Sequence, residues 1–186
     1  MKIGTTALTK VMHGTTAIQK VMRGTTVIWE AWVYKTGSLY TMTDASTPSP
    51  FVVTGRQVNN FSKYGSPYQA FDGVVSNGFG ADLYDAGAIL EATIIFNLPK
   101  AIRVKTLTWS FDQSSGTDSR TIWLQIDGSW VAIYSVIDGG LDSGTVDVGS
   151  GAYKDSLVTG IMARCTSQGS RNAYIREIKV TEWYEK

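Results

Sequence analysis

From Phe51 to the end of the chain, apolar and polar residues alternate in short runs that show no helical period. Successive side chains of a β-strand point to opposite faces, so this alternation predicts strands with one buried face. Clusters of Gly, Asp, Ser and Asn separate the runs and predict turns. Many short strands with turn-rich connections predict an all-β sandwich or jelly roll. The runs lie at residues 91–98, 104–111, 121–126, 130–137, 157–165 and 173–183.

The first 33 residues contain a ten-residue repeat whose units begin with Gly-Thr-Thr at Gly4, Gly14 and Gly24. The rest of each unit is short and often β-branched, which favours a strand. We predict three short strands in a meander over residues 1–35. Both faces of this arm are partly apolar, and a ribbon without a second layer buries too little surface to be stable alone. The arm is expected to self-associate as a trimer or to attach to another protein; packing on its own C-terminal domain is the alternative.

Residues 36–50 are rich in Ser, Thr and Pro and are interpreted as a linker, which leaves residues 51–186 for the sandwich.

The charge and hydropathy of the chain narrow the classes of partner that it can bind. Residues 1–36 carry five basic side chains against one acidic, and the remainder carries twelve against fifteen. The net charge of +1 gives no field for nucleic acid, and no apolar run reaches the ~20 residues of a membrane helix. The N-terminus has no apolar signal core, so assembly in the cytoplasm is expected rather than secretion by a signal peptide.

Three passages resemble the galactose-binding jelly-roll superfamily, in the discoidin and coagulation-factor type C branch that includes family 32 carbohydrate-binding modules. They are Pro67-Tyr-Gln-Ala-Phe-Asp-Gly, Gln125-Ile-Asp-Gly-Ser-Trp and Tyr174-Ile-Arg-Glu-Ile-Lys-Val. The sequence departs from the family after Asp72-Gly73, where the family has Thr and then Trp and this chain places Phe79 at the Trp position. The repeat resembles the short repeats that open many tailed-phage structural proteins. Together these resemblances imply a virion protein.

The resemblance also implies a structural calcium ion beside the Ala-Phe-Asp-Gly loop. Its ligands here would be Asp72 and Glu177, with Ser76, Gly78 and Gln69 as further oxygen donors. The alternative is that Asp72 caps a turn and Glu177 pairs with a neighbouring arginine.

In the family, sugars bind on loops at one end of the sandwich, by stacking on exposed aromatic rings and by polar groups that reach paired hydroxyls. The alternative for each aromatic residue is partial burial, and Trp109, Trp123, Trp130 and Trp183 are expected in the core or in strands. The candidates for the saccharide site are Phe79, Tyr84, Arg120, Tyr153, Arg171 and Asn172.

Catalytic chemistry has little support in the sequence. His13 is the only histidine and lies in the repeat arm, so Ser-His-Asp and Cys-His sites are not expected. The single cysteine, Cys165, lies in an alternating run and is predicted to be a buried structural thiol.

Three hypotheses follow. The first is an adhesion module of a phage tail, baseplate or fibre that binds glycan on the host surface. The second is a capsid decoration or head-fibre protein that binds no sugar. The third is a sugar-binding subunit of a cell-wall hydrolase.

Overall fold

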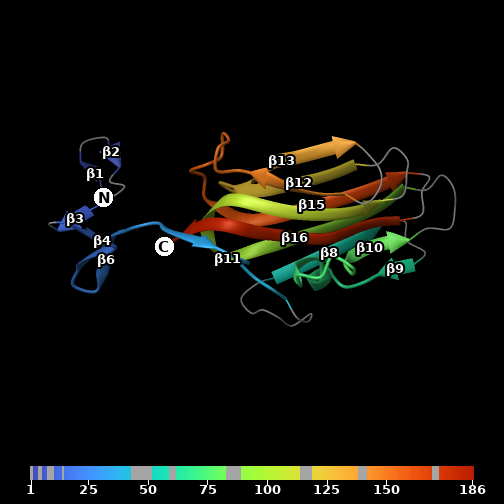
Figure 1. The fold of residues 1–186 in the computed structure, drawn as a ribbon, viewed down its shortest axis with the longest axis horizontal. Helices are drawn as coiled ribbons and strands as arrows, with labels where there is room; N and C mark the ends of the chain where they lie inside the picture. Colours follow the sequence, from blue (N-terminus) through green and yellow to red (C-terminus); the bar gives the residue numbers. More distant parts are fainter. Residues whose placement is uncertain are drawn as a thin grey trace.

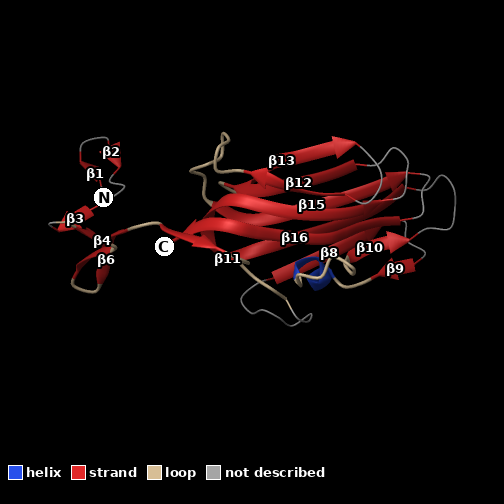
Figure 2. Ribbon diagram, in the orientation of Figure 1, coloured by secondary structure: helices blue, strands red, loops and turns tan. Residues whose placement is uncertain are grey.

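The computed structural model describes residues 2–3, 6–7, 11–13, 15–42, 52–58, 62–82, 89–113, 119–137, 142–168 and 172–186. These residues form strands and turns with one short 3₁₀ helix, η1 (Pro67–Phe71) (Figure 2). The prediction of an all-β fold is therefore confirmed. No helix in this described part of the chain is long and apolar enough to cross a membrane.

Two antiparallel sheets pack face to face to form the sandwich (Figure 1). The first sheet consists, in order, of β13 (Ser129–Ile137), β12 (Ser119–Ile126), β15 (Val158–Gln168), the first half of β11 (Ile89–Gln113) and β8 (Val52–Val58). The second sheet consists of β9 (Ser62–Tyr64), β10 (Phe79–Asp82), β16 (Asn172–Glu185), the second half of β11 and β14 (Asp142–Asp147). The short strand β7 (Val33–Thr36) pairs with the end of β16.

Strand β11 belongs to both sheets. Its first half pairs with β15 and β8, and its second half pairs with β16 and β14. The alternation predicted two strands here, at residues 91–98 and 104–111. The structure joins them, with a register shift between Asn97 and Ile102 at the point where Pro99 cannot donate a ladder hydrogen bond.

Apolar side chains from both sheets fill the space between them. Ile122 and Leu124 of β12 face Leu107 and Phe111 of β11, and all four are fully buried. Cys165 is also fully buried, as predicted. Trp109 and Trp183 belong to this core, whereas Trp123 and Trp130 are half-buried strand residues.

The start of the segment interpreted as a linker is part of the sandwich. The N–H groups of Gly37 and Leu39 donate to carbonyls of β16 at 3.0 and 3.1 Å. Tyr40 and Met42 are buried, and the Tyr40 ring lies 4.2 Å from the ring of Phe96. The linker interpretation is therefore wrong for residues 37–42, because their apolar side chains cover the core. Residues 43–50 lie outside the described residues.

The N-terminal arm is built of hairpins and extends beyond the end of the sandwich where the C-terminus lies (Figure 1). Six short strands form three two-stranded sheets, so the predicted three-stranded meander is wrong. In the third hairpin Gly24 has a φ of +60° at the turn, the left-handed region that glycine adopts readily. The strands are β1 (Lys2–Ile3), β2 (Thr6–Ala7), β3 (Val11–His13), β4 (Thr16–Ile18), β5 (Lys20–Arg23) and β6 (Thr26–Glu30).

Candidate functional site

Of the six residues predicted for the saccharide site, two lie outside the described residues and four lie within them. The two outside are Tyr84 and Arg171, which belong to segments 83–88 and 169–171. The backbone of Asn172 begins β16 and pairs with Asp82 at the end of β10.

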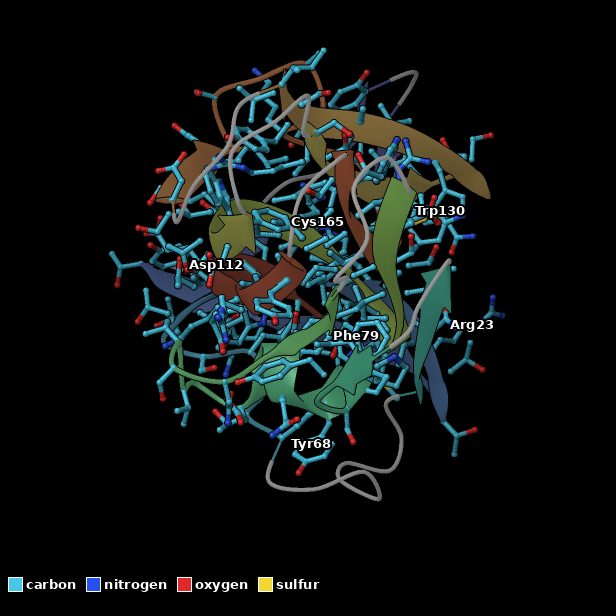
Figure 3. The ribbon with its side chains drawn as sticks, turned by 90° about the vertical axis from the view of Figure 1, so that its right-hand side faces the viewer. Arg23, Tyr68, Phe79, Asp112, Trp130 and Cys165 are labelled. Atoms are coloured by element: carbon cyan, nitrogen blue, oxygen red, sulfur yellow. The ribbon has the colours of Figure 1, made fainter. Side chains whose placement is uncertain are left out.

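Phe79 and Arg120 are buried, so the expectation that they contact a saccharide directly is wrong. Phe79 is 4% exposed and lies opposite Ile175 in β16. Arg120 shares the inward face of β12 with Ile122 and is 0% exposed. Its Nη1 donates to Oδ2 of Asp142 at 2.8 Å, which provides a partner for the buried charge. Figure 3 shows Phe79 among the interior side chains.

Tyr153 lies at the other end of the sandwich from Asn172. It follows β14, whose last residue Asp147 pairs with Thr106, whereas Asn172 lies next to Ala173, the partner of Gln113 at the far end of β11. The Tyr153 ring packs against the core. The structure therefore does not bring Tyr153 together with the other predicted site residues.

The turn after η1 brings Asp72 close to Glu177 of β16. The Asp72 carboxylate accepts hydrogen bonds from the Val74 N–H at 2.8 Å and from Nδ2 of Asn77 at 2.9 Å. Glu177 is 8% exposed, and its Oε2 accepts from the Gly73 N–H at 3.1 Å. Burial raises the pKa of Glu177 to about 8, against the lowering effect of the Gly73 hydrogen bond, and the Asp72 charge adds to the rise.

These contacts do not fit the calcium site that the resemblance implies. N–H groups, rather than further oxygen atoms, face both carboxylates. The carbonyl of Ser76 accepts from Nη1 of Arg176 at 3.5 Å, and the carbonyl of Gly78 lies against Gly65. Within the described residues, no three His, Cys, Asp or Glu side chains gather as a metal site would require. Calcium binding at this turn stays a prediction.

The outer face of the first sheet carries two tryptophans. Ile122 and Leu124 point into the core, so Trp123 between them points outward. Trp123 lies opposite Ala132 in β13, and Trp130 lies two residues before Ala132 on the same face. Diagonal neighbours of this kind have their Cα atoms roughly 7–8 Å apart. The two indole rings therefore form one surface, and Figure 3 shows Trp130 toward the outside of the molecule.

The Trp130 ring lies along the sheet because β15 has no side chain at Gly160. A Cβ atom at Gly160 would lie 3.0 Å from Cη2 of Trp130, although β12 separates the two strands. Between them, Oε1 of Gln125 accepts a hydrogen bond from the Thr159 hydroxyl at 2.9 Å. The Arg164 guanidinium lies 5.1 Å from the centre of the Trp123 ring. Amide, hydroxyl and guanidinium groups thus border the surface, which we call the Trp123–Trp130 surface.

Comparison with solved structures identifies the fold. The C-terminal domain of a chitobiase from Bacteroides fragilis superposes with a TM-score of 0.50 at 13% identity, over 74% of this chain and 97% of that domain. The chain shares the β-sandwich fold of that domain. A family 32 carbohydrate-binding module of Clostridium perfringens, solved in complex with galactose, gives a TM-score of 0.46 at 17% identity, over 72% of this chain and 93% of the module. The sequence matches no protein-family model and none of the curated proteins compared with it.

The sequence carried a signal for this surface that the resemblance obscured. The alternation that places Ile122 and Leu124 in the core also places Trp123 outside. The resemblance instead points to aromatic residues of the loops, because the family binds sugars there. The same alternation places Arg120, two residues before Ile122, on the inward face of the strand, and this predicts its burial. The position of Trp130 over Gly160 depends on strand order, which the sequence does not show.

Proposed function

We propose that the chain is a glycan-binding protein and not an enzyme, and that the Trp123–Trp130 surface contacts the sugar. The observation that supports this is the Trp130 ring lying along the outer face of a sheet, half-buried and bordered by polar groups. The C–H face of a pyranose ring is apolar and stacks on a flat aromatic ring, while the hydroxyls at its edge need polar partners. The surface offers both a flat aromatic ring and polar groups at its border.

Substitution of Trp130 tests the proposal. A glycan array probed with the full-length chain would first identify a ligand, and calorimetry would then compare variants. Trp130→Ala should weaken binding at least roughly fivefold, about 1 kcal/mol, while Trp130→Phe should retain most of the affinity because a ring remains. The melting temperature should change little, since the side chain is only half-buried. Loss of binding in Tyr153→Ala but not in Trp130→Ala would contradict the assignment.

The arm supports a more specific role. We propose that its hairpins gather copies of the chain, as a trimer, and attach them to other proteins of a bacteriophage-type virion assembled in the host cytoplasm, where the sandwich would bind host-surface glycan. A single shallow sugar site typically binds at about 1 mM. Linked copies raise the apparent affinity ~100-fold or more when their geometry allows simultaneous contact. The arm and the sandwich would then act in one mechanism.

The alternative function is structural, as a capsid decoration or head-fibre protein that binds no sugar. The arm would serve assembly equally well in that role. An array with no bound glycan, together with a trimer in light scattering, would favour this alternative.

A further inference from the structure

The outer face of the second sheet carries a cleft of about 650 Å³. This volume lies within the range of small-molecule sites, roughly 300–1,000 Å³. Leu107, Trp109 and Phe111 point into the core, so the residues between them in β11 point outward. The lining consists of Thr108, Trp109 and Ser110 of β11, Asp142, Ser143, Gly144 and Thr145 of β14, Glu177 of β16, and Val75.

Strand register gathers four hydroxyl groups in this cleft. Thr108 lies opposite Thr145, and Ser110 lies opposite Ser143. Ser110 is 6% exposed, and its hydroxyl makes no hydrogen bond with the described residues. A buried hydroxyl that faces a cleft without a protein partner is available to a ligand.

Ser110 also lies opposite Glu177, the most deeply buried carboxyl group of the cleft. One carboxyl oxygen of Glu177 accepts from the Gly73 N–H, and the other has no donor among the described residues. Asp142, at the rim, is paired with Arg120. Lys179 lies two residues from Glu177, but its charge lowers the pKa of Glu177 by less than the charge of Asp72 raises it. None of the described residues that line the cleft is basic.

We propose that this cleft is a second saccharide site and that it selects a sugar carrying an unsubstituted amino group. The ligand would be a saccharide as in the proposed function, on which this inference rests, but it would bind on the opposite sheet. An ammonium group would donate to the free oxygen of Glu177, and ring hydroxyls would bond to Ser110 and Thr145. Burial raises the pKa of Glu177, and a bound ammonium group would offset that rise by stabilising the ionised carboxylate. Hydrogen bonds between charged partners are stronger than neutral ones. An anionic sugar would gain no such ion pair.

The test compares a glucosamine tetramer with an N-acetylglucosamine tetramer by calorimetry on the full-length chain. EDTA would be present so that no divalent cation competes for Glu177. The glucosamine tetramer should bind about tenfold more tightly, and Glu177→Gln should remove this preference. Gln can still accept from the Gly73 N–H, so the fold should persist, as melting would verify. Ser110→Ala should weaken binding of the glucosamine tetramer without any change of charge. Glu185→Gln, on the same strand outside the cleft, should match the wild type.

The outcomes separate this inference from the proposed function. Trp130→Ala should weaken any binding at the first surface and leave the preference for the free amine intact. Equal affinity of the wild type for both tetramers, or a preference that persists in Glu177→Gln, would overturn the amino-sugar cleft while leaving the Trp123–Trp130 surface in place. Failure of the wild type to bind the glucosamine tetramer would overturn the amino-sugar cleft as well.

Discussion

At the scale of single residues, burial decides which polar side chains can act on a ligand and which stabilise the fold. Arg120 shows the difference, because its guanidinium lies inside the sandwich against Asp142. Glu177 is almost as deeply buried, yet it lines a cleft, so a ligand could reach it. The exposed fraction alone does not distinguish the role of Arg120 from that of Glu177. The surroundings of their polar atoms do, because the Arg120 guanidinium faces the core and the Glu177 carboxyl faces a cleft.

Arg120→Ala should therefore destabilise the protein rather than remove a ligand contact. Truncation of a fully buried long side chain leaves a cavity, and the free energy of unfolding should fall by about 2–5 kcal/mol. Urea unfolding would measure this change. Asp155→Ala is the control, because it removes an ion pair to Arg103 at 3.3 Å whose carboxylate is 73% exposed; such pairs contribute about 0–1 kcal/mol. Equal stability of Arg120→Ala and the wild type would show that the guanidinium is not buried in solution.

At the scale of elements, the end of β16 is tied to β7 and β11 through Glu182. Its carboxylate accepts hydrogen bonds from the hydroxyls of Thr106 and Tyr34 and lies 3.0 Å from Nζ of Lys105. The Thr106 hydrogen bond, followed by those from Tyr34 and Lys105, lowers the pKa of Glu182 to about 2. Since β7 leads out of the arm, this cluster holds the junction between arm and sandwich.

The lowered pKa of Glu182 predicts a dependence of stability on pH. Its stabilising contribution is fully present above the unfolded value of 4.5 and is lost as the pH falls toward 2. In Glu182→Gln, the free energy of unfolding should be lower at pH 7 and should change less between pH 4.5 and pH 2 than in the wild type. Urea unfolding across this range would measure both effects, with Glu185→Gln as the control on the same strand. An unchanged pH profile in Glu182→Gln would contradict the assigned cluster.

Alternation of apolar residues predicts β11, β12, β13, β15, β16 and most of the core, because the two-residue period of a strand determines which side chains face inward. It does not predict the strands β8, β9, β10 and β14. Composition is a weaker guide than alternation. The Ser and Thr content around residues 37–42 indicates a linker, yet Tyr40 and Met42 in this segment are large side chains two residues apart, and both are buried. Strand pairing across long sequence separations, such as β11 with both sheets, created the cleft and could not be derived from local pattern.

At the scale of the whole molecule, the arm and the sandwich are built as separate parts joined by β7. Trp32, immediately before β7, lies against two cations, with the Arg103 guanidinium 4.5 Å and Lys186 Nζ 4.7 Å from its ring. These contacts belong to the sandwich side of the junction. The boundary between the arm and the sandwich therefore lies near residue 31, and not in the linker that the composition indicates at residues 36–50.

Two deletions test this boundary. Removal of residues 1–31 should leave the melting temperature of the sandwich close to that of the full-length chain and should convert a trimer to a monomer in light scattering. Removal of residues 1–42 should lower the melting temperature clearly, because Tyr40 and Met42 leave the core. A full-length chain that is monomeric, or a shorter deletion that melts as low as the longer one, would contradict this division.

The central claim is that the sandwich binds glycan on the Trp123–Trp130 surface, and an NMR titration tests it most directly. The indole N–H signals of the six tryptophans would be followed while the best ligand from the array is added to the full-length chain. The signals of Trp130 and Trp123 should shift in a saturable manner, while that of the buried Trp183, which lines neither proposed site, should stay in place. Saturable binding that leaves Trp123 and Trp130 unshifted would contradict the claim.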